Sequence, residues 1–179
     1  MPRPDAKPLD DTPARPPDRQ HSPTQRMRQI PLAIGPDPAR SFESFLAGGN
    51  WAALEHLLRL GPLSAPTYLW GPTGSGKSHL LGALAAAWQA AGARVGWFSP
   101  ATTGAWSFDD GCRLVVLDDC EALDAARQQD AFALFVEATS AGVPVVAAGA
   151  LPPVDLPLRD DLRSRLGWGV VFALQPLSE

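Results

Sequence analysis

Lysine is nearly missing from this chain of 179 residues. Only Lys7 and Lys77 are lysines, and arginine supplies the rest of the positive charge. Acidic residues outnumber basic ones by 19 to 15, which gives a formal net charge of −4. This balance argues against a broad basic surface for nucleic acid, so we expect no direct sequence-specific binding of DNA.

Long apolar runs and clustered cysteines are missing as well. No segment has eighteen uninterrupted apolar residues or the layout of a signal peptide, so we expect a cytoplasmic protein that does not enter membranes. The two cysteines, Cys112 and Cys120, lie on either side of the run RLVVLDD. If this run is a strand, eight steps of about 3.3 Å each separate the sulfurs too far for a disulfide. We therefore predict two free thiols and no Cys/His metal site.

Proline is concentrated at the start of the chain. Residues 1–26 hold seven prolines among charged and small polar residues, a composition that predicts a disordered tail. The composition changes at Met27. We expect residues 27–40 to form a peptide and linker, and residues 41–179 to form one folded domain with ample apolar residues for a core.

The most informative stretch is YLWGPTGSGKSHLL, residues 68–81. Its segment from Gly71 to Ser78 fits the pattern G-x-x-x-x-G-K-[ST] at every fixed position, between a predicted strand and a predicted helix. Glycines let successive backbone N–H groups turn inward around a phosphate, and the amino end of the helix adds positive charge there. The predicted nucleotide-binding residues are Gly71, Pro72, Thr73, Gly74, Ser75, Gly76, Lys77, Ser78 and His79.

Two side chains of this loop carry the chemistry. The Lys77 ammonium can reach the β and γ phosphates, and the Ser78 hydroxyl can bind Mg²⁺. The expected ligands are therefore ATP or ADP with Mg²⁺. The alternative is a glycine-rich turn that only connects strand to helix, but such a turn needs neither the lysine nor the hydroxyl.

Two carboxylates end the apolar run LVVLDD, residues 114–119. A buried parallel strand delivers its last residues to the edge of the sheet where the phosphate loop also opens. We predict that Asp118 belongs to the Mg²⁺ shell and that Asp119 positions the attacking water. The alternative is that both carboxylates cap the following helix.

The remaining pattern alternates helices and strands. Asn50 is a candidate cap for a helix whose apolar face would hold Trp51, Leu54, Leu57, Leu58 and Leu60. Helices are predicted at 78–91, at 128–140 and within 156–166, and strands at 94–99, 114–119, 143–148 and 168–174. This order predicts an α/β fold, a three-layer sandwich of the P-loop NTPase type with a mostly parallel five-stranded sheet.

A short apolar peptide, RQIPLAI, precedes the domain at residues 28–34. Its Gln29, Leu32 and Ile34 have a spacing that resembles the peptide by which bacterial proteins dock on the replication sliding clamp. In such a peptide the glutamine hydrogen-bonds at a pocket rim while the aliphatic side chains fill apolar holes. The alternatives are an edge strand or a linker that packs on the domain.

From Met27 onward, several segments resemble the DnaA initiator family of AAA+ proteins. The matching segments are SFESFLAGGN, YLWGPTGSGKSHLL, LVVLDD, LPPVDLPLRDDLRSRLGWG and LQPLS. The resemblance is strongest to the Hda-type regulators, which inactivate DnaA and carry a clamp-binding peptide. It implies two partners, the DnaA initiator and the sliding clamp, and a role as an inhibitor of replication initiation that promotes hydrolysis of DnaA-bound ATP in trans.

The resemblance also places the arginine finger of the family on Arg165, with Arg163 facing solvent. The alternative for Arg165 is an ion pair with Asp160 or Asp161. Two departures from the family pattern lower the expected intrinsic ATPase. Ala148, Gly149 and Ala150 stand where polar residues are expected, and the sequence ends at Glu179 before the helical lid of the family.

Three functions therefore remain open from the sequence. The first is the DnaA regulator. The second is an autonomous AAA+ ATPase of the helicase-loader or transposition-helper type, and the third is a lid-less scaffold without nucleotide control. The resident nucleotide and the formation of a homodimer also remain open.

Overall fold

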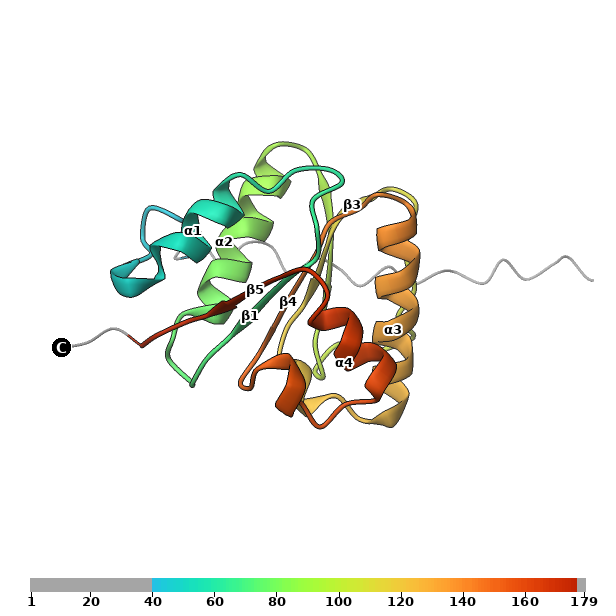
Figure 1. The fold of residues 1–179 in the computed structure, drawn as a ribbon. Coiled ribbons are helices and arrows are strands. Elements are labelled where there is room, and N and C mark those ends of the chain that lie inside the picture. Colours follow the sequence, from blue (N-terminus) through green and yellow to red (C-terminus); the bar gives the residue numbers. More distant parts are fainter. Residues whose placement is uncertain (1–39, 177–179) are drawn as a thin grey trace, which may run out of the picture.

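The computed structural model describes residues 40–176, which form a single five-stranded sheet between two layers of helices (Figure 1). The strand order is β2-β3-β4-β1-β5, and every neighbouring pair is parallel. The strands are β1 (Thr67–Trp70), β2 (Arg94–Phe98), β3 (Cys112–Leu117), β4 (Val145–Gly149) and β5 (Val170–Ala173). The predicted P-loop NTPase fold is confirmed.

Helices cover both faces of the sheet. Figure 1 shows α1 and α2 on one face and α3 and α4 on the other. The α-helices are α1 (Trp51–Leu58), α2 (Lys77–Ala90), α3 (Ala125–Ser140) and α4 (Asp160–Leu166), and the short 3₁₀ helices are η1 (Gly48–Asn50), η2 (Cys120–Ala122) and η3 (Pro153–Asp155). Parallel strands need such crossover connections, which explains why their central strands are buried on both sides.

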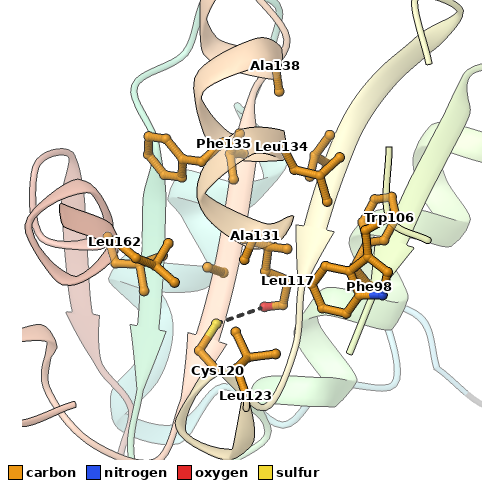
Figure 2. Packing of buried hydrophobic residues seen from close by; sticks show 14 of the residues in the cluster. Phe98, Trp106, Leu117, Cys120, Leu123, Ala131, Leu134, Phe135, Ala138 and Leu162 are labelled. Carbon is orange, nitrogen blue, oxygen red and sulfur yellow. Dashed lines mark hydrogen bonds between the residues drawn. The ribbon is translucent and has the colours of Figure 1, made fainter. Parts of the chain in front are cut away.

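Each face of the sheet has its own apolar core. On the α1/α2 face, Leu69, Leu80 and Val146 are among the fully buried side chains. On the α3/α4 face, Figure 2 shows Leu134 and Phe135 of α3 packed toward the sheet. Side chains alternate between the faces along a strand, so β1 contributes to both cores.

Both cysteines are buried free thiols, as predicted. Cys120 lies in the core beside α3, where its thiol donates to the carbonyl oxygen of Leu117 at 3.8 Å (Figure 2). Cys112 donates to the carbonyl oxygen of Leu114 at 2.9 Å. Burial raises the pKa of both thiols, so neither is an activated nucleophile.

The predicted role of Asn50 is wrong. Its side chain makes no capping bond to α1. Instead its amide nitrogen donates to the carbonyl oxygen of Gln175, and its amide oxygen accepts from the N–H of Gln175, both at 2.8 Å. We call this pair the Asn50–Gln175 clasp. It joins the start of α1 to the segment that follows β5.

The predicted apolar face of α1 is also partly wrong. Trp51 and Leu58 point away from the core, with 67% and 58% of their surface exposed. The buried face is made by Ala53, Leu54 and Leu57. Ala53 is 2% exposed and belongs to the core on this face, so the helix turns a small residue inward and its tryptophan outward.

Several element ends differ from prediction. Helix α3 begins three residues earlier than expected, at Ala125, because Asp124 caps it by accepting from the N–H of Arg127 at 2.8 Å. Strand β3 runs over Cys112–Leu117, so Asp118 and Asp119 lie just beyond it. Within residues 40–176, no helix is long and apolar enough to cross a bilayer. The predicted tail and clamp peptide, with Gln29, Leu32 and Ile34, lie outside the described residues.

Candidate nucleotide site at the carboxyl edge of the sheet

The loop between β1 and α2 depends on two glycines. Gly76 has a φ of 91°, and a Cβ there would lie 2.6 Å from the Phe45 ring. A Cβ at Gly71 would collide with the carbonyl oxygen of Leu174. Both positions therefore exclude a side chain, and the loop remains narrow enough to surround a phosphate with backbone N–H groups.

The Lys77 ammonium lies over this loop. Its Nζ donates to the carbonyl oxygens of Gly71 at 2.6 Å and Pro72 at 2.9 Å. Because α2 begins at Lys77, the positive end of the helix points to the same place. A phosphate here would meet a cation and a helix terminus together, so the residues present fit a nucleotide phosphate.

Ser78 and Asp118 meet beside the loop, although forty residues separate them in the sequence. Asp118 is only 7% exposed. Burial and the neighbouring Asp119 charge raise the pKa of Asp118, and a hydrogen bond from Ser78 partly offsets the rise. A hydroxyl beside a carboxylate is a donor set of the kind that binds Mg²⁺, which takes its other ligands from phosphate and water.

Asp119 has a strained backbone. Its φ of 54° and ψ of 46° lie in the left-handed region, which few residues other than glycine adopt. Its side chain is exposed, and its N–H donates to Oδ1 of Asp118 at 3.0 Å. Asp119 makes no side-chain capping bond, and the cap of α3 is Asp124, so the capping alternative is not supported.

The segment before α1 packs on the start of α2. His79 Nε2 lies 3.0 Å from the carbonyl oxygen of Ser41 and 3.3 Å from the Ser44 hydroxyl, and its ring centroid is 5.5 Å from that of Phe45. Arg40 donates to the carbonyl oxygen of Ser78 at 3.3 Å. The loop motif predicts His79 as a nucleotide-binding residue. It does not predict the contacts with Ser41, Ser44 and Phe45, because these residues are more than thirty positions away in the sequence.

Comparison with known proteins identifies this arrangement. No protein-family model matches the sequence. Among solved structures, a DNA replication initiation factor has 26% identity and a TM-score of 0.68, with 78% of this chain and 50% of that chain covered. DnaA from Aquifex aeolicus, bound to AMPPCP, has 25% identity and a TM-score of 0.68, with 78% and 51% covered. The chain has a DnaA-like AAA+ fold.

Further structures share this fold. Domain III of the Thermotoga maritima replication initiation protein DnaA has 24% identity and a TM-score of 0.68, with 79% of this chain and 69% of that chain covered. DnaI, at 14% identity and a TM-score of 0.61, shares the fold alone. The present chain spans about half the length of the first two structures.

The carboxyl end of β4 holds no polar side chain in this DnaA-like domain. Ala148, Gly149 and Ala150 occupy it, as the sequence reads. A Cβ at Gly149 would collide with the Tyr68 hydroxyl and lie 3.0 Å from Oε2 of Glu121. The Tyr68 hydroxyl is already engaged, because it donates to the carbonyl oxygen of Leu151 at 2.9 Å. The Tyr68 side chain of β1 and the Glu121 side chain of η2 therefore occupy the space beside Gly149.

The arginines in α4 and just before it differ in whether they pair with the two carboxylates of the helix. Arg163 pairs with Asp160 at 2.5 Å and Arg159 pairs with Asp161 at 2.7 Å. Arg163 is thus half-buried in an ion pair rather than simply solvent-facing. Among residues 40–176 Arg165 forms no ion pair, so the expected alternative of a bridge to Asp160 or Asp161 is not observed.

Arg165 lies in the last turn of α4, five residues before the start of β5. The segment that follows α4 meets the amino end of β1, where the N–H of Val170 donates to the carbonyl oxygen of Pro66 at 2.8 Å. The loop begins at the other end of β1, at Gly71. The five steps of extended chain from Pro66 to Gly71, at about 3.3 Å each, separate these two backbone positions by roughly 16 Å. The structure thus brings Ser78 and Asp118 together, whereas the segment that follows Arg165 meets the end of β1 opposite to the phosphate loop.

Proposed function

We propose that this domain binds ATP or ADP with Mg²⁺ and regulates chromosomal replication initiation by promoting hydrolysis of DnaA-bound ATP in trans. The observation that carries the proposal is the position of Arg165. It has no acidic partner among the described residues, and its own phosphate loop lies at the opposite end of β1. An arginine without an acidic partner, on a segment that joins the end of β1 opposite to the phosphate loop, would be available to a neighbouring molecule.

Nucleotide binding is supported by the loop and by the solved relatives. The backbone N–H groups of residues 71–76 and the Lys77 ammonium would hold the phosphates, and Ser78 and Asp118 would hold Mg²⁺. The bound cation would neutralise charge between the β and γ phosphates. Aquifex aeolicus DnaA binds AMPPCP with the same fold, which favours the same use here.

Slow intrinsic turnover follows from the carboxyl end of β4. Asp119 is exposed and can accept a hydrogen bond from an attacking water. No second polar side chain can hold that water from the β4 side, because Ala148, Gly149 and Ala150 offer none. The nucleotide would then serve mainly to stabilise the conformation of the domain.

The action on the partner would come from the Arg165 guanidinium. A guanidinium beside the γ-phosphate of a neighbour stabilises the charge that develops in the transition state. Such a group is worth about 10³ to 10⁵ in rate. Docking on the sliding clamp through Gln29, Leu32 and Ile34 is a second part of the proposal, and it rests on the sequence alone.

The test is hydrolysis of DnaA-bound ATP in the presence of this chain and clamp loaded on DNA. We expect Arg165→Ala to lower the stimulated rate by about 10³-fold or to the rate of DnaA alone. Arg163→Ala is the matched control, because it removes an α4 arginine that is paired with Asp160. Gln29→Ala should lower stimulation only when the clamp is present.

Two outcomes would contradict the proposal. Equal stimulated rates for the wild type and for Arg165→Ala would remove the arginine from the mechanism. Brisk ATP hydrolysis by the purified chain, without DnaA or clamp, would favour an autonomous ATPase instead.

A further inference from the structure

Arg165 has one aromatic neighbour at the end of α4. The guanidinium carbon of Arg165 lies 5.2 Å from the centre of the Trp168 ring, within the range of a cation–π contact. Three residues separate them, and the N–H of Trp168 donates to the carbonyl oxygen of Arg165 at 3.2 Å. Trp168 is nevertheless 68% exposed. Its ring therefore adds little to the core, and the contact that it makes with the Arg165 guanidinium is the cation–π contact.

The backbone on both sides of Trp168 is tightly packed. A Cβ at Gly167 would lie 3.3 Å from Cβ of Pro153 in η3, and a Cβ at Gly169 would collide with the carbonyl oxygen of Pro66. The end of α4 therefore approaches η3 closely, and the N–H of Val170 ties the start of β5 to the carbonyl oxygen of Pro66 at 2.8 Å. Trp168 thus lies between two glycines whose backbone approaches neighbouring elements closely.

The charges around Arg165 favour the ring over an acid. Asp161 is four residues before Arg165, a spacing that suits a helical ion pair. Asp161 instead accepts from Arg159 at 2.7 Å and from the N–H of Leu162 at 2.8 Å. A carboxylate partner would occupy the N–H groups of Arg165 and neutralise its charge. An aromatic face contacts the plane of the guanidinium and leaves its N–H edge able to bind a phosphate.

We propose that Trp168 is a positioning residue that holds the Arg165 guanidinium in the orientation needed at the γ-phosphate of an ATP-bound partner. This inference rests on the proposed function, and it adds a residue that acts through Arg165. Without the ring, the arginine side chain would sample several rotamers and lose part of its preorganisation.

The experiment compares three variants in the stimulated hydrolysis of partner-bound ATP, measured over a range of concentrations of this chain. Trp168→Ala should lower the maximal rate about two- to fivefold, the worth of one exposed cation–π contact, and leave the half-saturating concentration unchanged. Trp168→Phe should restore most of the rate because it keeps an aromatic face. Trp51→Ala is the matched control, since Trp51 is 67% exposed on α1, which covers the opposite face of the sheet from α4 (Figure 1).

A second readout follows the contact itself. In nuclear magnetic resonance spectra, the Nε–H signal of Arg165 should shift when Trp168 becomes alanine, because the ring current is lost. It should remain unchanged in Trp51→Ala. Thermal unfolding of the variants checks that an exposed side chain was removed without loss of the fold.

The proposal is overturned if Trp168→Ala keeps the full maximal rate, or if it changes only the half-saturating concentration, as a simple docking contact would. A Trp168→Phe variant as slow as Trp168→Ala would also contradict it. The proposed function fails separately, through Arg165→Ala: if that variant stimulates like the wild type, or if the wild type gives no stimulation, Arg165 has no role for Trp168 to support.

Discussion

Replacing Asn50 by serine tests whether this residue fastens the fold or only caps a helix. Serine caps helices about as well as asparagine, so a capping role predicts little change. The clasp predicts a clear loss, because the serine side chain is too short to reach both the N–H and the carbonyl oxygen of Gln175. The two explanations therefore give opposite results for one substitution.

The expected magnitude follows from the two bonds. Each hydrogen bond contributes about 0.5 to 1.5 kcal/mol net, and Asn50 is only 5% exposed, so water replaces it poorly. We expect Asn50→Ser to lower the free energy of unfolding by about 1 to 3 kcal/mol. With a urea m-value of about 2 kcal/mol/M, the unfolding midpoint would fall by roughly 0.5 to 1.5 M.

The assay is urea unfolding followed by circular dichroism, with Asn50→Ala and Trp51→Ala measured beside Asn50→Ser. Asn50→Ala should match the serine variant, and Trp51→Ala should change stability by less than about 0.5 kcal/mol because its side chain is exposed. If the serine variant unfolds at the wild-type midpoint while the alanine variant does not, Asn50 is a cap and the clasp contributes nothing.

Three further predictions concern other parts of the domain. ATP should raise the melting temperature of the wild type but not of Lys77→Ala, as thermal unfolding with and without Mg²⁺ would show. Gly149→Ala should lower the free energy of unfolding, measured in urea, by about 1 to 3 kcal/mol, because the new Cβ collides with the Tyr68 hydroxyl. The added loss should be smaller in a Tyr68→Phe background, which lacks this hydroxyl. If the losses of the two single variants simply add in the double variant, the collision does not explain the effect. Burial lowers the pKa of His56, so stability should be full above about pH 6.5 and decrease as the pH falls below it, and His56→Gln should flatten that decrease between about pH 7 and 5.

Local patterns in the sequence predicted the elements that carry the site. The glycine, lysine and serine of GPTGSGKS predicted a strand, a loop and a helix, and the structure has β1 and α2 on either side of that loop. The apolar run ending in Asp118 predicted a buried strand at the same edge of the sheet. These predictions succeed because the motif residues are contiguous and their backbone requirements are local.

Features that depend on distant contacts could not be predicted. Asparagine is a common helix cap, but the side chain of Asn50 bonds to Gln175 at the other end of the domain. Trp51 fits the apolar period of α1, yet the residues that α1 buries are Ala53, Leu54 and Leu57. The Arg165–Trp168 contact had a visible signal, a spacing of three residues, but spacing alone does not show which carboxylates the other arginines occupy.

The Asn50–Gln175 clasp also has a consequence for the order of folding. Its partners are 125 residues apart in the chain, so the clasp closes almost the whole described domain into one loop. Contacts of such separation generally form after the local helices and neighbouring strands, because loop closure costs entropy that earlier contacts must first offset. The clasp should therefore be absent from the folding transition state and act mainly on the unfolding rate. Leu174, whose carbonyl oxygen lies against Gly71, is next to the clasp but is also held by its own N–H bond to the carbonyl oxygen of Trp70 at 2.6 Å. Opening of the clasp alone should therefore leave this wall of the phosphate loop in place, so the nucleotide site should outlast the clasp during unfolding.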